Sequence, residues 1–260
     1  FKNRLYYWTG VDQNFYYSAT VSTHQGNMTV FPTGLVGTFG GNLIQIGTLT
    51  QDGGEGVDDL LTLIMSSGEV LVYSGTDPSA SSFALVGTFR IAEPINEPRA
   101  IAKLGGDLIV ITKEGYLPLS QVFRQDLVGN KAKAISEKIR GTVIRQVALT
   151  GSTVGWQIHI SADGSKVYFS YPTGDSTDTY NQHVFNPIIG AWTIFQNIPS
   201  LVWSNYNGDT YFGTTGGKVY KVGGTADLTI AITADLSFAY NYFGDRGSTK
   251  RFTSVAPMLE

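Results

Sequence analysis

The stretch that decides the fold is residues 101–119, IAKLGGDLIVITKEGYLPL. It holds three apolar segments, at residues 101–104, 108–111 and 116–119, separated by the turns Gly-Gly-Asp and Lys-Glu-Gly. Short apolar segments joined by glycine-containing turns are typical of antiparallel strands in hairpins. We therefore predict a three-stranded antiparallel meander over these residues.

The same order of strands and turns recurs along the chain. It returns at residues 201–222, and in looser form at 60–91 and 156–195, with residues 1–33 as a further unit. Repeated small meanders of roughly 40–50 residues are typical of a β-propeller. We predict an all-β fold, a β-propeller of five to six small antiparallel blades over residues 1–226, followed by a C-terminal β extension at 227–260 that belongs to a second β element. A β-sandwich is the rival fold, but it has no such periodic unit.

Residues 131–146 break the strand pattern. Their apolar side chains follow a helical period of about 3.6 residues: Ala134, Ile135, Ile139, Val143 and Ile144. Charged side chains form the other face: Lys131, Lys133, Glu137, Lys138 and Arg140. We predict one surface helix that ends near Gly141. Its basic residues are candidate subunit contacts, although a solvated face is the favoured explanation.

The composition excludes several classes of protein. Charged residues are 15% of the 260 residues and the net charge is −3, so the basic surface needed to grip nucleic acid is missing. There is no cysteine, which excludes disulfides and thiolate chemistry. No apolar run reaches the ~20 residues of a membrane span. Because the sequence begins at Phe1, we expect a trimmed N-terminus or a fragment.

The titratable residues do not suggest an active site. The three histidines, His24, His159 and His183, fall in different units without metal-ligand spacing, and His159 should face away from Ile158 and Ile160 because strand side chains alternate. We predict neither enzymatic activity nor a cofactor.

Asp77 is expected to serve a turn. Trp192 and Phe195 are expected to pack between blades, with a sugar-binding Trp192 as the alternative.

One acidic segment is a candidate calcium site. Residues 51–59 place four carboxylates among three glycines, namely Asp52, Glu55, Asp58 and Asp59. Calcium takes such oxygen ligands from flexible loops. The EF-hand spacing is absent, because Leu63 stands at the twelfth position from Asp52. A solvated turn before the strand at Leu60 is the favoured alternative.

A family resemblance rests on the joint order of these segments. They run DDLL (58–61), SGEVLVYSGTDP (67–78), LVGTFRI (85–91), GGDLIVIT (105–112), EGYLPLS (114–120), AISEKI (134–139), NPIIGAW (186–192), DTYFG (209–213), YFG (242–244) and KRF (250–252). Over nearly the whole chain, this order resembles a family of tailed-phage virion structural proteins, akin to the tail hub or nozzle proteins of short-tailed phages.

The resemblance implies a role in the virion. It implies a non-catalytic subunit of a homo-oligomeric ring in the phage tail, in contact with other tail or neck proteins. Double-stranded DNA would pass through the ring during ejection without specific binding, which suits a mildly acidic chain. Stable membrane insertion is not expected. The candidate subunit contacts are Lys131, Lys133, Lys138, Arg140, Lys250 and Arg251.

Two other functions are compatible with the sequence. The first is a carbohydrate-binding propeller, for example a tail adhesin for a host surface glycan, with exposed Trp or Tyr side chains stacking on sugars. The second is a propeller glycosidase, which requires two carboxylates about 5–9.5 Å apart across a pocket. Aromatic and polar groups gathered in one pocket would favour the first, and paired carboxylates the second.

Overall fold

The computed structural model describes residues 1–20, 26–52, 57–123, 134–174, 179–227 and 230–235, together with Gly247, Thr249 and Arg251. At residues 51, 52, 57 and 58 it describes the backbone alone. The chain divides into two units, Phe1–Val222 and Gly223–Glu260.

The first unit consists of five antiparallel sheets, each a meander in chain order. The predicted all-β class is confirmed, and the sheets follow the sequence units that suggested it. The first sheet holds β1 (Tyr6–Trp8), β2 (Asn14–Ser18) and β3 (Met28–Pro32); the second β4 (Leu43–Asp52), β5 (Val57–Met65), β6 (Glu69–Ser74) and β7 (Ala84–Arg90); the third β8 (Ile101–Leu104), β9 (Asp107–Thr112) and β10 (Gly115–Pro118); the fourth β11 (Gln157–Ile160), β12 (Val167–Pro172), β13 (Tyr180–Asn186) and β14 (Ala191–Phe195); and the fifth β15 (Val202–Tyr206), β16 (Asp209–Gly213) and β17 (Val219–Lys221).

Successive sheets pack face to face, so the inner sheets are buried on both faces. Strand β5 shows how the sequence achieves this, because its neighbouring side chains point to opposite faces. Leu61 and Leu63 pack toward the first sheet, whereas Leu60 and Ile64 pack toward the third. A strand buried on both faces needs a nearly continuous apolar run, which is the pattern of residues 60–65.

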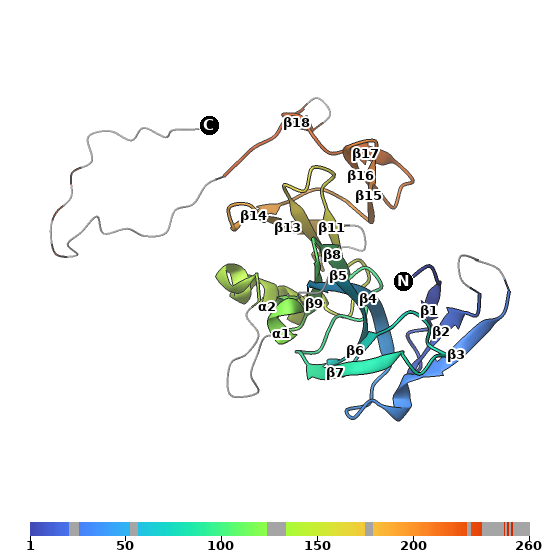
Figure 1. Cartoon of the computed structure of the whole chain (residues 1–260). Helices are drawn as coiled ribbons and strands as arrows, with labels where there is room; N and C mark the ends of the chain where they lie inside the picture. Colours follow the sequence, from blue (N-terminus) through green and yellow to red (C-terminus); the bar gives the residue numbers. More distant parts are fainter. Residues whose placement is uncertain are drawn as a thin grey trace. The chain divides into compact units, whose positions relative to one another are not determined.

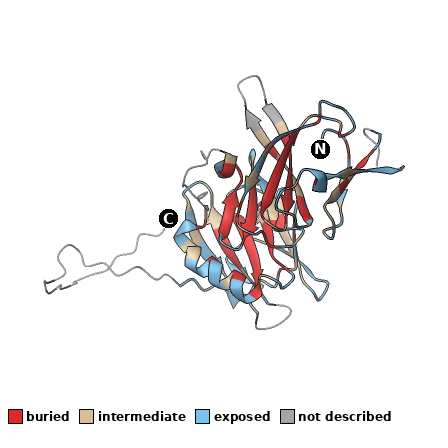
Figure 2. Ribbon diagram, turned by 90° about the horizontal axis from the view of Figure 1, so that it is seen from below, coloured by how far each residue is buried: buried red, intermediate tan, exposed pale blue. Residues whose placement is uncertain are grey.

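Four apolar clusters fill the spaces between the sheets. The cluster between the third and fourth sheets is built around Trp156, Tyr116 and Phe169. The cluster between the fourth and fifth sheets is the smallest, with Tyr168, Val184 and Trp203 as its buried members. Figure 2 shows the buried residues concentrated in the central sheets. The core is therefore a series of layers between sheets.

The first strands of the sheets lie side by side (Figure 1). Strand β1 contacts β4, β4 contacts β8, and β8 contacts β11. Strands β11 and β15 are joined by the Asn205 amide, which donates to the Ile160 carbonyl at 2.9 Å. The described residues do not show a closed propeller, because the outer faces of the first and fifth sheets remain exposed.

One turn illustrates why glycine recurs between the strands. Gly68 joins β5 to β6 with φ of +84°, a conformation that L side chains rarely adopt. A Cβ at this position would also lie 2.4 Å from the carbonyl oxygen of Ile91. The turn therefore needs glycine both for its conformation and for the close approach of residue 91.

The predicted helix at residues 131–146 is wrong in its bounds. The main helix, α2, runs from Arg140 to Thr150, after a 3-10 turn, η2, at Glu137–Ile139. Gly141 therefore lies in the first turn of α2 rather than at its end, and Lys131 and Lys133 lie outside the described residues. The buried stripe is Val143, Val147 and Thr150, spaced i, i+4, i+7, and it packs on the cluster around Trp156. Two other short helices are α1 (Ser120–Phe123) and η1 (Thr33–Leu35).

In the second unit, the described strands are two short ones, β18 (Ala226–Asp227) and β19 (Ile230–Ala231), paired as a hairpin. The β extension predicted over residues 227–260 is described only in part. Asp227 and Ile230–Ala231 belong to these strands, whereas residues 232–235 have no regular secondary structure. Ile230 is 71% exposed and Ile232 is 60% exposed. Beyond residue 235, the structure describes Gly247, Thr249 and Arg251.

Candidate functional site

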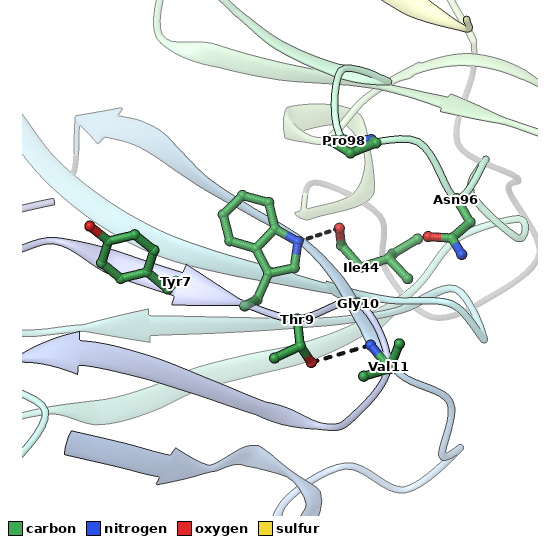
Figure 3. A pocket seen from close by; sticks show the side chains of 8 residues that line it. Tyr7, Thr9, Gly10, Val11, Ile44, Asn96 and Pro98 are labelled. Carbon is green, nitrogen blue, oxygen red and sulfur yellow. Dashed lines mark hydrogen bonds between the residues drawn. The ribbon is translucent and has the colours of Figure 1, made fainter. Parts of the chain in front are cut away.

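The larger pocket lies where the first and second sheets meet the segment that leads into β8 (Figure 3). Its volume is about 540 Å³. Three groups of residues line it: Tyr7 to Val11 at the end of β1, Ile44 of β4, and Asn96 with Pro98. It is therefore assembled from three segments that are far apart in the sequence.

Hydrogen bonds fix the walls of this pocket. The indole Nε1–H of Trp8 donates to the carbonyl of Ile44 at 2.6 Å, which ties β1 to β4. The opposite wall is held by Gln45, whose side-chain amide donates to the carbonyl of Glu97, and by Ile95, whose N–H donates to the carbonyl of Ile111 at 3.0 Å. These contacts hold the aromatic ring of Trp8 and the 96–98 segment in place.

The chemistry of this pocket is that of binding. None of its eight lining residues is Asp, Glu, His, Lys or Arg. Its polar groups include the Tyr7 hydroxyl, the Thr9 hydroxyl, which accepts from the Val11 N–H at 3.3 Å, and the exposed Asn96 side chain. The lining therefore offers hydroxyl, amide and apolar surfaces to a ligand. It suits a neutral ligand with apolar and hydroxyl surfaces.

A smaller cavity of about 170 Å³ lies between the fourth sheet and the start of α2. Its lining residues are Ile139, Thr142, His183, Trp192, Thr193 and Ile194. His183 is fully buried, and its Nδ1 lies 2.7 Å from the hydroxyl of Tyr116. Burial lowers the pKa of His183 to about 4 and raises the pKa of the Tyr116 hydroxyl well above 10. Both groups are therefore neutral at pH 7.

The basic residues predicted as subunit contacts do not share one environment. Lys138 is exposed and its Nζ donates to the carbonyl of Gly190 at 3.0 Å. Arg140 pairs with Glu114 at 3.7 Å and with Glu137 at 4.0 Å. Arg251 is exposed. Lys131, Lys133 and Lys250 lie outside the described residues.

The candidate calcium residues are described only in part. Glu55 and the side chains of Asp52 and Asp58 fall outside the described part of the chain. Asp59 accepts a hydrogen bond from the Thr50 hydroxyl at 2.8 Å and lies 3.6 Å from Lys2. The Thr50 bond is the main cause of its lowered pKa. Among the described residues, no three His, Asp or Glu side chains gather as a metal site.

The histidines occupy separate environments. His159 stacks on the ring of Trp203 with centroids 5.7 Å apart, whereas Ile158 and Ile160 face the opposite cluster, so its predicted orientation is confirmed. Its Nε2 lies 2.9 Å from Oδ1 of Asn205. His183 lies on the other face of the fourth sheet, against Tyr116. His24 falls outside the described residues.

Two turn and packing predictions are confirmed, and one contact was missed. Trp192 packs on the cluster between the third and fourth sheets, and Phe195 packs on the cluster between the fourth and fifth sheets. Asp77 accepts from the N–H of Ser79 at 2.9 Å, as a turn residue does. It also accepts from the buried Arg4 at 2.7 Å. No signal in the sequence connects these two residues, which are 73 positions apart.

The outer faces of the first and fifth sheets carry exposed apolar side chains. On the first sheet, Tyr7, Tyr16 and Val30 form a row across the strands, opposite to the face that holds Phe15. On the fifth sheet, Val202 and Val219 flank Gly213. Val30 is 50% exposed and Val219 is 71% exposed. In the three inner sheets, apolar clusters cover both faces.

No protein-family model matches the chain, and no curated protein matches it. Among the described residues, no helix is long and apolar enough to cross a membrane.

Proposed function

We propose that this chain is a non-catalytic structural subunit of a phage tail, of the hub or nozzle type, that assembles with copies of itself into a ring. In this proposal the five sheets are the blades of an open propeller, the ring is part of the virion, and it contacts other tail or neck proteins. The order of segments that resembles tail proteins supports the family, and the architecture of the first unit supports a role in assembly.

The observation that carries the proposal is the pair of uncovered end faces. Every inner sheet is covered on both faces, while the first and fifth sheets each leave open a face with exposed apolar side chains. On the fifth sheet this face also carries the ion pair of Lys221 and Asp209, 2.7 Å apart. Apolar surface of this kind on a monomer marks an interaction site. A second copy can continue the stack by placing its first sheet on the fifth sheet of its neighbour.

Such a contact joins two different surfaces. A head-to-tail interface of this type produces a ring when its rotation closes. The net charge of −3 fits a conduit that releases DNA, because a surface without basic excess does not hold phosphates. The absence of charge from the row Tyr7, Tyr16 and Val30 suits the buried core of an interface, from which charged residues are depleted.

Single lysine substitutions test this interface. Val30→Lys on the first sheet or Val219→Lys on the fifth should each reduce the assembly to the 28.1 kDa monomer, because a buried unpaired charge opposes the contact. The measurement is molar mass by light scattering. Ile188→Lys is the matched control, since Ile188 is 80% exposed in the turn between β13 and β14, and it should keep the mass of the parent protein.

Mixing the two variants separates a head-to-tail contact from other geometries. Val30→Lys retains an intact fifth-sheet face, and Val219→Lys retains an intact first-sheet face. An equimolar mixture should therefore form dimers of one copy each and nothing larger. Variants that keep the parent mass, or a mixture that stays monomeric, would refute the end-face assembly.

The pocket at Trp8 favours carbohydrate binding as a second candidate function. It combines an aromatic ring with the polar Thr9 and Asn96 and lacks charge, which suits a neutral saccharide. Trp8→Ala should abolish retention on a glycan array while Trp203→Ala, in the last interlayer cluster, should leave it intact. An array on which the parent protein binds no glycan would remove this candidate.

A further inference from the structure

We propose that the cavity between the fourth sheet and α2 is a binding site for a carboxylate group, held by the ring N–H groups of His183 and Trp192. This proposal goes beyond assembly through the end faces and does not depend on it. The cavity measures about 170 Å³, which is enough space for a small planar anion.

Two hydrogen-bond donors without acceptors carry the proposal. Trp192 Nε1 and His183 Nε2 are both buried and find no partner among the described residues. Leaving a buried polar group unpaired costs about 1–3 kcal/mol, so two such groups beside one cavity need an explanation. An acceptor that enters from outside satisfies both.

The hydrogen bond with Tyr116 determines that Nε2 of His183 carries a hydrogen and acts as a donor. The Tyr116 hydroxyl meets the Nδ1 atom of His183 at 2.7 Å and has no other acceptor among the described residues. Its proton therefore points to Nδ1, and a neutral imidazole then carries its own hydrogen on Nε2. Together with the indole N–H of Trp192, the site presents two donors and requires an acceptor.

The strand register places the two rings on one face of the sheet. Trp192 of β14 stands opposite Phe185, and Ile194 stands opposite His183. Because side chains alternate, these four side chains share the face that packs on the cluster around Tyr116 and Trp156. Thr142 of α2 closes the cavity from the other side and is exposed, as is Ile194. The rim of the cavity is therefore exposed, whereas the two ring nitrogens are enclosed, so an acceptor reaches them when the side chains around them move.

Charge at the rim favours an anion over a neutral carbonyl. Lys138, next to the lining residue Ile139, reaches across to the carbonyl of Gly190, two positions before Trp192. That contact uses one of the three ammonium hydrogens, and no carboxylate pairs with Lys138 among the described residues. Glu137, the acid nearest in sequence, lies 4.0 Å from Arg140. A singly charged carboxylate can accept hydrogen bonds from the two neutral N–H donors and is attracted by the one cation.

The four tryptophans provide an internal control for the test. The indole groups of Trp8, Trp156 and Trp203 each donate to an acceptor within the chain, at 2.6, 2.8 and 2.9 Å. The experiment is a titration of ¹⁵N-labelled protein with sodium acetate at pH 7, with sodium chloride at the same ionic strength as reference. The Trp192 indole signal should shift downfield to saturation under acetate while the other three signals stay in place.

Two variants assign the shift to the site. Trp192→Phe, for which acetate binding is followed at the ring ¹⁵N signals of His183, should weaken acetate binding at least about tenfold, since a hydrogen bond to a charged group is lost. Lys138→Met should weaken it less, and Lys218→Met, in the turn between β16 and β17, should have no effect. The three remaining indole signals report in the same spectrum that each variant is folded. Retained affinity in Trp192→Phe would overturn the proposal.

Capped Gly-Asp-Gly and Gly-Asn-Gly peptides distinguish the sources of the carboxylate. Binding of the Asp peptide but not the Asn peptide indicates a site for an acidic side chain of a neighbouring protein. Binding of acetate alone indicates a site for a free small carboxylate. If neither acetate nor the Asp peptide moves the Trp192 signal, the two donors are hydrated by water and the proposal is wrong.

Discussion

Trp156→Ala is expected to lower the free energy of unfolding by about 3–5 kcal/mol, the range for deleting a fully buried large aromatic side chain. Trp156 is 1% exposed and lies at the centre of the cluster shared by the third sheet, the fourth sheet and α2. Its indole N–H donates to the carbonyl of Thr150 at 2.8 Å, which anchors the last turn of the helix. Alanine leaves a cavity there and removes this anchor, so that the Thr150 carbonyl keeps only its hydrogen bond from the Thr153 N–H at 2.9 Å.

Urea unfolding measures this effect, and two variants calibrate it. Trp156→Phe keeps much of the ring but loses the hydrogen bond to Thr150, so it should cost clearly less than alanine. Trp8→Ala removes a half-buried ring at the edge of the stack and should also cost less. If Trp156→Ala destabilises the protein no more than Trp8→Ala does, the cluster between the third and fourth sheets is not its main core.

His183 is expected to make the protein less stable as the pH falls from 6.5 to 4. Burial lowers its folded pKa to about 4 from the ordinary value of 6.5. In this window the unfolded chain binds a proton that the folded chain does not, so the free energy of unfolding decreases as pH decreases. A shift of this size corresponds to about 3 kcal/mol at full extent. Above pH 6.5 the effect is absent.

His183→Gln should flatten this pH dependence. Glutamine does not titrate, and its carbonyl can accept from the Tyr116 hydroxyl. The free energy of unfolding is measured in urea at several pH values between 7 and 4.5, which limits contributions from carboxylates such as Asp163, whose pKa is lowered mainly by its hydrogen bond with Ser161. His159→Gln shows how much of the pH dependence comes from His159, because burial also lowers the pKa of that residue. Equal slopes in the parent and His183→Gln would contradict this account.

The sheets could be predicted from the sequence because their signals are local. The segments at 101–104, 108–111 and 116–119 became β8, β9 and β10, and the turns between them hold Gly105 and Gly115 at positive φ. Strand β5 was recognisable from its nearly continuous apolar run at residues 60–65, which only Thr62 interrupts. Such features depend on neighbouring residues alone, so no knowledge of distant contacts is needed.

The bounds of the helix and the partners of the site residues depend on contacts between residues far apart in the sequence. They could therefore not be predicted from the sequence. Ala134, Ile135 and Ile139 extend the helical period backward, yet α2 begins at Arg140, because residues 134–136 instead bond back to the third sheet. The Ile135 N–H donates to the Tyr116 carbonyl at 3.0 Å, and the Ser136 hydroxyl accepts from the Tyr116 N–H at 3.0 Å. Likewise, the unpaired donors of His183 and Trp192 follow from packing across two strands and cannot be read from spacing.

The measurement that tests assembly most directly is the molar mass of the purified chain by size-exclusion chromatography with light scattering, over a wide range of protein concentration. The head-to-tail account predicts a discrete species of three or more copies of the 28.1 kDa chain, with a mass that reaches a plateau because the ring closes. A mass of 28.1 kDa at every concentration would contradict it.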